Sequence, residues 1–213
     1  MIGDKLILQP YHMPPARDIY AAISDSVAAK QPYFISIGGE SGCGKSTLAI
    51  ALREVLKEHG HESFTLHMDD YFKLPPTSTH ELRLDDINHV GPQEVRMDLL
   101  QEHIDHIRAG KGELIKPLVH YKENNIRREI FYPQDFQVFI VEGTYVTNLL
   151  HIDTKVFLTR DYKDTWESRV ARARDPLTPF IEEVLEIEHR IIKEHVSAAH
   201  LIVNKDYEVE MVS

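Results

Sequence analysis

Short apolar runs alternate along the chain with longer stretches in which apolar residues recur at helical spacing. The apolar runs fall at residues 32–37, 63–68, 136–141, 155–159 and 200–204. Helical spacing is clearest at residues 47–56, 92–110 and 179–192. Buried parallel strands read as continuous apolar runs, and the connection between two of them is usually a helix. The pattern therefore predicts an α/β fold in three layers, with a five-stranded parallel sheet and helices on both of its faces.

No internal repeat, low-complexity run or linker interrupts this alternation, and 213 residues suit one domain. We therefore expect one domain over residues 1–213, with an amphipathic lead-in helix within residues 1–31. A small extended excursion around a charged tip is expected at residues 114–133.

Between the first strand and the following helix, the chain reads G-x-x-x-x-G-K-S, the phosphate-binding loop (P-loop) of nucleoside triphosphatases and kinases. Its glycines let successive backbone N–H groups turn inward around a polyanion at the positive N-terminus of a helix. Lys45 adds a charge that can reach the β- and γ-phosphates, and the Ser46 hydroxyl can bind Mg²⁺. The residues expected to hold the nucleotide are Gly39, Glu40, Ser41, Gly42, Cys43, Gly44, Lys45, Ser46 and Thr47.

The strand before the loop and the helix after it supply the context that the motif requires, which disfavours a glycine-rich structural turn as the alternative. The expected fold class is therefore that of the P-loop nucleoside triphosphatases, with ATP and Mg²⁺ as ligands. No base-reading motif separates ATP from GTP, and adenine is expected near residues 204–207. Cys43 is the single cysteine, and its place at a helix N-terminus beside Lys45 predicts a lowered thiol pKa and ready alkylation.

Composition excludes some classes of function. A net charge of −10 argues against a general nucleic-acid binder, which needs a basic face. No stretch approaches the ~18 apolar residues of a membrane span, and the first residues do not resemble a signal peptide. We expect a cytoplasmic protein that is not membrane-bound. Its oligomeric state, including a homo-oligomer, stays open.

Ionisable residues follow several of the apolar runs directly. Chemistry in open parallel sheets gathers at the carboxyl ends of the strands. This rule selects Asp69, Asp70, Glu142, Arg160, Asp161 and residues 204–206. Because strands must also end in something polar, each position taken alone has a structural alternative.

Three segments, at residues 39–47, 68–72 and 139–143, resemble the uridine kinase/phosphoribulokinase family, whose wider group includes nicotinamide riboside kinases and pantothenate kinase. The resemblance extends over residues 31–207 and implies an ATP-dependent kinase. In the family, an aspartate after the second strand accepts the proton of the acceptor alcohol. Asp69 matches that position, and Asp70 is the weaker candidate. A carboxylate there orients the alcohol for in-line attack on the γ-phosphate, and positioning carries most of the catalysis in phosphoryl transfer.

The resemblance also makes Glu142 the acidic residue that lies near Mg²⁺, together with Ser46; a salt bridge at the strand end is the alternative. Residues 163–178 correspond to a lid, in which arginines neutralise the charge that develops in the transition state. The lid arginines are Arg169, Arg172 and Arg174. A longer arginine run of the family lid is absent here. Which arginine reaches the phosphate therefore stays open, and a solvated basic helix is the alternative.

The acceptor site departs from that of uridine kinases. Val90 stands where their ribose-binding aspartate would fall, so recognition of ribose by that route is lost. Residues 88–94 are closer to the pattern of phosphoribulokinases. The resemblance assigns the acceptor to Asp69, Phe72, His89, Tyr121 and Arg128. For the last two of these, an exposed charged hairpin tip is the alternative.

Together these features predict an ATP-dependent phosphotransferase that moves the γ-phosphate to an alcohol of a small molecule, of nucleoside, vitamin or sugar type. One alternative is a phosphoribulokinase-like kinase acting on a sugar phosphate, although the chain is short for that family. Another alternative is a nucleotide-dependent regulatory ATPase or switch, which does not need a base such as Asp69 directed at an acceptor.

Overall fold

The computed structural model describes residues 8–166 and 178–212 of the chain. Its strands are β1 Tyr33–Gly39, β2 Ser63–His67, β3 Leu114–His120, β4 Asn125–Phe131, β5 Val138–Gly143, β6 Thr154–Leu158, β7 Leu201–Val203 and β8 Val209–Met211. Its α-helices are α1 Met13–Ala29, α2 Lys45–Glu58, α3 Pro76–Asp85, α4 Met97–Arg108 and α6 Pro179–Ile192. The short 3-10 helices are η1 Pro10–His12, η2 Met68–Tyr71, η3 Ile87–His89, η4 Pro92–Glu94, η5 Tyr121–Glu123, η6 Pro133–Asp135, η7 Val146–Asn148 and η8 Lys193–Ala198.

The five predicted apolar runs form the parallel part of the central sheet, in the order β2–β5–β1–β6–β7. The sheet has six strands rather than the predicted five, because β8 adds to β7 as an antiparallel edge. Two of the three residues of β8 are exposed. This segment therefore lacks the continuous apolar run that marks a buried strand. It is a strand because it pairs with β7.

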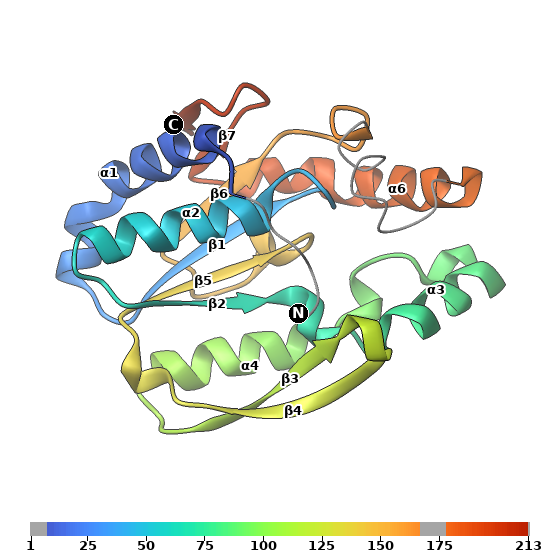
Figure 1. Cartoon of the computed structure of the whole chain (residues 1–213), viewed down its shortest axis with the longest axis horizontal. Coiled ribbons are helices and arrows are strands. Elements are labelled where there is room, and N and C mark those ends of the chain that lie inside the picture. The colour runs from blue at the N-terminus through green and yellow to red at the C-terminus, as the bar shows by residue number, and fades with distance from the viewer. Residues whose placement is uncertain (1–7, 167–177, 213) are drawn as a thin grey trace.

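Side chains of β1 alternate between the two faces of the sheet, and each face is covered (Figure 1). Ile35 and Ile37 join a buried cluster with side chains of α1 and α2. Phe34 points to the opposite face, where it clusters with Leu100 and Ile104 of α4. In Figure 1, α1 and α2 lie on one side of the sheet, while α4 and the β3–β4 pair lie on the other. This arrangement is the predicted three-layer α/β fold.

The first helix packs on α2 through one apolar stripe. Ala16, Ile19, Ile23 and Val27 recur at helical spacing, and all four are buried. Prolines in the first turn suit the start of a helix, because the N–H groups there have no partner within the helix. The predicted lead-in helix therefore belongs to the layer that covers the α2 face of the sheet.

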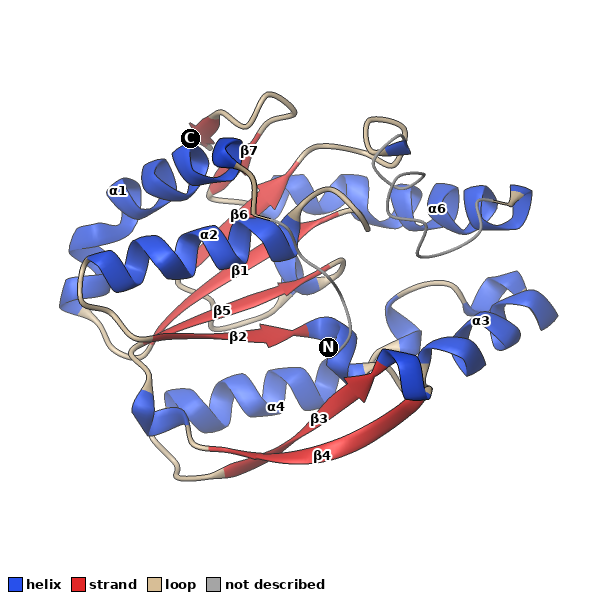
Figure 2. Cartoon of the chain, in the orientation of Figure 1, coloured by secondary structure: helices blue, strands red, loops and turns tan. Residues whose placement is uncertain are grey.

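Residues 114–131 form a separate two-stranded antiparallel sheet, β3 and β4, which Figure 2 shows beneath α4. The pairing runs from Leu114 opposite Phe131 to His120 opposite Asn125. Asn124 makes the turn between the strands with a left-handed φ of 46°. Leu114 and Phe131 are buried in the cluster that includes α4. One end of the pair is thus anchored to the core, and the other end carries the charged tip.

Across residues 8–166 and 178–212, none of the helices has the length and apolar content that a membrane span needs.

Candidate active site

The phosphate-binding motif joins β1 to α2 by a loop that depends on glycine. Gly39, Gly42 and Gly44 have φ values of 142°, 79° and 107°, a region that side-chain-bearing residues rarely adopt. A Cβ atom on Gly39 would also lie 2.8 Å from the carbonyl oxygen of Leu158. The loop leads directly into α2, whose first N–H groups have no partner within the helix. The local geometry is therefore that of an anion-binding helix N-terminus.

Lys45 is folded over this loop. Its ammonium donates to the carbonyl oxygen of Glu40 at 2.7 Å, and only 8% of the residue is exposed. A charge held in this way lies close to the backbone amides of the loop, where it adds to the positive potential of the helix N-terminus.

The expectation of a reactive Cys43 is wrong. The residue is 0% exposed and belongs to the core cluster between the sheet and α2. Burial raises the pKa of the Cys43 thiol, and neither the charge nor the backbone N–H of Lys45 offsets this effect. The thiol points into the core, so position at a helix N-terminus was a misleading guide.

Glu142 links three elements at the carboxyl edge of the sheet. One carboxylate oxygen accepts from the Ser46 hydroxyl at 3.1 Å, and the other lies 2.6 Å from Nδ1 of His67. Burial would raise the pKa of Glu142, but the hydrogen bond and charge of His67, the charge of Lys45 and the Ser46 hydroxyl hold it below its ordinary value. The carboxylate is therefore ionised at neutral pH. His67 was missed in the sequence analysis. It is the last residue of β2, and its register with Glu142 exists only once β2 and β5 are paired.

The oxygen donors of Ser46 and Glu142 suit Mg²⁺, which prefers hard ligands and keeps several waters. Within the described ranges, no group of three or more His, Cys, Asp or Glu side chains is arranged to hold a metal ion. Ser46 and Glu142 are the residues that would hold Mg²⁺ here, together with water and the oxygens of a bound phosphate.

Asp69 and Asp70 lie in η2, directly after β2, but have different surroundings. Asp70 is 1% exposed, accepts from the backbone N–H of Val119 at 3.0 Å, and lies 3.9 Å from the ammonium of Lys116. It thus ties η2 to β3. Asp69 is only partly buried, and its charge acts on the hydroxyl of Tyr145, which follows β5. Of the two, Asp69 is the less buried carboxylate.

The residues assigned to the acceptor come from several segments around η2. Phe72 forms a β-bridge with Val95, so the segment after η2 lies beside the end of η4. His89 is half-buried in η3, whereas Val90 beside it is 3% exposed. Tyr121 and Arg128 lie farther along the β3–β4 pair, where Tyr121 is half-buried and Arg128 is exposed. Their contact with an acceptor stays a prediction.

A buried charged cluster beside these segments was not expected. Arg83 of α3 binds Glu94 of η4 with two hydrogen bonds, at 2.7 and 2.8 Å, and lies 3.5 Å from Glu188 of α6. Tyr145 is 4% exposed, and its hydroxyl has no hydrogen-bond partner among the described residues. Burial raises the Tyr145 pKa, and the charges of Glu188, Glu94 and Asp69 raise it further, against the opposing charge of Arg83. Arg83, Glu94, Tyr145 and Glu188 come from four separate segments, so no local sequence pattern connects them.

Arg169, Arg172 and Arg174 lie outside the described residues. The chain on either side of them is attached to the phosphate-binding loop through Glu40. Its carboxylate accepts from the backbone N–H of Tyr162 at 2.7 Å and lies 2.5 Å from Nδ1 of His189 in α6. Glu40 can therefore offer its backbone, but not its side chain, to a phosphate.

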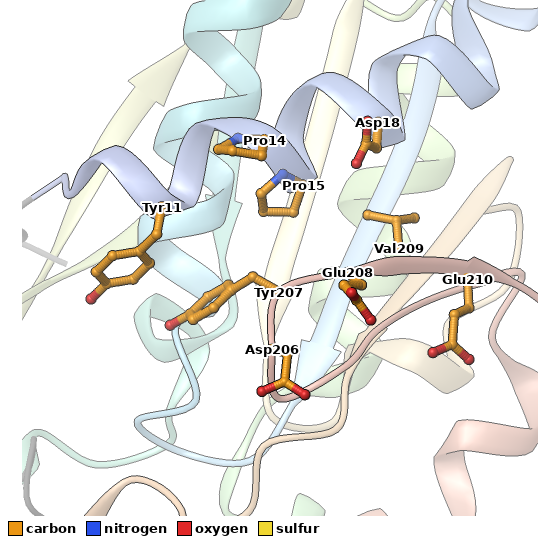
Figure 3. A pocket seen from close by; sticks show the side chains of 9 residues that line it. All are labelled: Tyr11, Pro14, Pro15, Asp18, Asp206, Tyr207, Glu208, Val209 and Glu210. Atoms are coloured by element: carbon orange, nitrogen blue, oxygen red, sulfur yellow. The ribbon is translucent and has the colours of Figure 1, made fainter.

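Tyr207 lies on the outer side of the same loop, near the place expected for adenine. Its hydroxyl is 3.8 Å from the Cβ position of Gly44, and Arg160 donates to that hydroxyl. Beyond Tyr207 lies a cavity of about 570 Å³, with Tyr11 and Tyr207 toward one end (Figure 3). Its lining also includes the carboxylates of Asp18, Asp206, Glu208 and Glu210. This acidic surface would repel a triphosphate, so the cavity is separate from the phosphate site.

Known proteins resemble this chain in sequence and in fold. The profile of the Phosphoribulokinase / Uridine kinase family matches residues 34–206. A uridine kinase of Staphylococcus epidermidis is 31% identical over 177 residues, which cover 73% of this chain and 83% of that enzyme. The bifunctional alpha-galactosidase/sucrose kinase of Mediterraneibacter gnavus is 30% identical over 192 residues, or 84% of this chain. This match spans only 20% of the length of the Mediterraneibacter enzyme. A match to the uridine kinase of Clostridium novyi spans 63% of the length of that uridine kinase.

Solved structures show the same fold at low sequence identity. Phosphoribulokinase from Rhodobacter spheroides superposes with a TM-score of 0.62 at 14% identity, covering 82% of this chain and 70% of that one. D-glycerate 3-kinase from Cryptococcus neoformans superposes with a TM-score of 0.60 at 14% identity, covering 92% and 99%.

Proposed function

Because the chain belongs to the phosphoribulokinase/uridine kinase family, we propose that it is an ATP-dependent phosphotransferase whose acceptor is an alcohol group of a small molecule. The observation that carries this proposal is the meeting of three features at one edge of the sheet. These are the phosphate-binding loop, the Ser46–Glu142 pair and the partly buried Asp69. A protein that only bound a nucleotide would need the first two features but not the third.

The nucleotide is held by the loop. Backbone N–H groups at the start of α2 and the ammonium of Lys45 would surround the phosphates, and the oxygens of Ser46 and Glu142 would hold Mg²⁺. When bound, Mg²⁺ neutralises part of the charge on the β- and γ-phosphates. His67 keeps Glu142 oriented and ionised by its hydrogen bond to the second carboxylate oxygen. ATP is the preferred nucleotide in this proposal.

Asp69 acts on the acceptor. Its carboxylate accepts the proton of the acceptor hydroxyl while that oxygen bonds to the γ-phosphorus. The bond between the γ-phosphorus and the β–γ bridging oxygen breaks, and ADP leaves with that oxygen. The products are ADP and a phosphate monoester of the acceptor. Arg169, Arg172 and Arg174 are proposed to neutralise charge on the transferred group.

The acceptor is proposed to be an uncharged, hydroxyl-rich molecule of sugar or nucleoside type. Relatives named uridine kinase and sucrose kinase both take such acceptors. Val90 is buried and apolar, so ribose would need contacts other than those expected in uridine kinases.

The test is an acceptor panel assayed for ADP release, with and without the Asp69→Asn substitution. The panel pairs each neutral compound with its phosphate ester, such as fructose with fructose 6-phosphate, and adds uridine and sucrose. We expect at least one neutral compound to stimulate ADP release. The substitution should lower acceptor-dependent kcat by ~10²–10⁴-fold and change the affinity for MgATP by less than about tenfold.

Asp98→Asn is the matched control, because Asp98 is an exposed aspartate in the first turn of α4. It should leave kcat and both KM values unchanged. If MgATP binds but no compound raises ADP release above the rate without acceptor, the kinase proposal fails in favour of a nucleotide-dependent switch. If only the phosphate esters respond, the assignment of a neutral acceptor is wrong.

A further inference from the structure

Glu40 places a carboxylate within the loop that is proposed to bind phosphates. The residue is 7% exposed, so water does little to screen its charge. A bare carboxylate at this position would repel the triphosphate. In this chain each of its two oxygens has a hydrogen-bond partner outside the loop, Tyr162 for one and His189 for the other.

The two partners are themselves held together. The backbone N–H of Tyr162 donates to Oε2 of Glu40, and Nδ1 of His189 lies 2.5 Å from Oε1. The rings of Tyr162 and His189 meet edge to face, with centroids 5.9 Å apart. The Tyr162 hydroxyl donates to Glu186, on the same helix as His189, at 2.6 Å. Helix α6 and the segment that follows β6 thus hold the Glu40 side chain in one position.

Glu40 also shapes the nucleotide side of the loop through its backbone. Its carbonyl oxygen accepts both from the ammonium of Lys45 at 2.7 Å and from the backbone N–H of Cys43 at 3.2 Å. Glu40 therefore contacts α6 through its side chain and Lys45 through its backbone carbonyl oxygen. A shift of the Glu40 side chain would move the carbonyl oxygen that positions Lys45.

We infer that His189 is a positioning residue for the nucleotide: its contact with Glu40 offsets the carboxylate that the loop places beside the phosphates, and so favours their approach to Lys45 and the loop amides. This inference rests on the proposed function only in that the loop binds a nucleoside triphosphate. The free energy of binding then includes less repulsion between the carboxylate of the loop and the phosphates.

A purely structural brace would behave differently when both partners are changed. If the pair only braced the loop, each single substitution would weaken nucleotide binding, and removing both groups would not restore it. If His189 offsets a charge, then His189→Ala leaves the carboxylate beside the phosphates with the backbone N–H of Tyr162 but without its imidazole partner. Glu40→Gln removes that charge and should rescue the His189 variant.

The experiment measures Kd for MgATP by calorimetry in the wild type, His189→Ala, Glu40→Gln and the double variant. We expect His189→Ala to weaken binding by about tenfold, as a single uncompensated charge near the phosphates would. Glu40→Gln should bind within about threefold of the wild type or more tightly, and the double variant within about threefold of the wild type. His200→Ala is the control, because this exposed histidine lies just before β7, and its Kd should not change.

Two results would overturn the inference: an unchanged Kd in His189→Ala, or a double variant that binds MgATP no more tightly than His189→Ala does. Thermal unfolding of each variant without nucleotide accompanies the measurement, and equal melting temperatures show that a weaker Kd is not due to unfolding. Failure of the kinase proposal would look different. In that case MgATP would bind and the four variants would give the expected Kd values, but no acceptor would stimulate ADP release.

Discussion

Neighbouring aspartates in η2 have different surroundings. The carboxylate of Asp70 is buried against Val119 and Lys116, so its partners are structural. We expect Asp70→Asn to lower the free energy of unfolding by about 1–3 kcal/mol, because it removes a charge from a buried hydrogen-bonded site and leaves Lys116 with one carboxylate partner fewer. Turnover per folded molecule should change by less than about tenfold.

The matched comparison is Asp69→Asn, which alters a less buried carboxylate and should leave the unfolding transition in place. Urea unfolding and acceptor-dependent turnover are measured on both variants. The assignment would be wrong if the Asp70→Asn variant were as stable as the wild type but had lost turnover, while the Asp69→Asn variant retained it. Asp70 would then be the residue that acts on the acceptor.

Cys43 gives a second prediction about a single side chain. Because it is buried and its thiol pKa is raised, the reactive thiolate is scarce and shielded. Alkylation by iodoacetamide should be at least ~100-fold slower in the native protein than in urea, since it requires local opening of the loop. Mass spectrometry reads this directly, because the chain has one cysteine. Equal rates in the native and unfolded protein would contradict the buried placement.

Helix α4 is joined to η2 by a buried histidine. His103 is 8% exposed, and its Nδ1 lies 2.9 Å from the hydroxyl of Tyr71. Burial lowers the pKa of His103 to about 4, and the charges of His106 and Lys116 act in the same direction. The neutral ring therefore accepts the hydrogen bond from Tyr71. The stability of this contact between η2 and α4 should depend on pH.

Between the ordinary pKa of 6.5 and the folded value of about 4, the unfolded chain binds a proton at His103 that the native protein does not. Stability must then fall as the pH falls through this window. His103→Gln removes this contribution and should reduce the stability difference between pH 7 and pH 5 by about 2 kcal/mol. The exposed His80 provides the control, because His80→Gln should keep the wild-type difference. An unaltered difference in the His103 variant would show that the ring is protonated in the native state.

The whole molecule concentrates its candidate chemistry at the carboxyl edge of the parallel sheet. The loop after β1, η2 after β2 and Glu142 at the end of β5 meet there because parallel strands in adjacent positions end on the same side. In Figure 1, α3 and α6 extend on that side of the sheet. Ligand binding at this edge contacts several elements at once, so it should stabilise the fold as a whole.

MgATP at about 100 times its Kd should stabilise the wild type by about 2.7 kcal/mol, which raises Tm by roughly 5–10 °C in a domain of this size. Lys45→Ala removes a charge contact to the phosphates and should weaken binding by at least ~2 kcal/mol, so most of this rise should disappear. Scanning calorimetry with and without MgATP provides the measurement. Lys57→Ala, an exposed change on the same helix, should keep the full rise. A full rise in the Lys45 variant would remove the loop from the nucleotide site.

Local patterns were sufficient for the parallel strands and for the phosphate-binding loop. A buried strand must be apolar along its own length, and the loop needs its glycines, lysine and serine within eight consecutive positions. Both requirements act on residues that are neighbours in the chain, so they can be read without knowing the fold. The same reasoning located Asp69, Asp70 and Glu142 at strand ends, because the boundary of an apolar run is itself a local feature.

Packing decided the features that depend on distant residues. β8 is a strand because β7 offers it a free edge, and Cys43 is buried because α2 presses the loop against the sheet. Glu40 and His189 are 149 residues apart, yet share a hydrogen bond. No periodicity or motif links such positions, since their contact exists only once the sheet and α6 are assembled. The sequence alone therefore identifies the residue types that suit phosphate binding. The hydrogen-bond partners of these residues follow only from the fold.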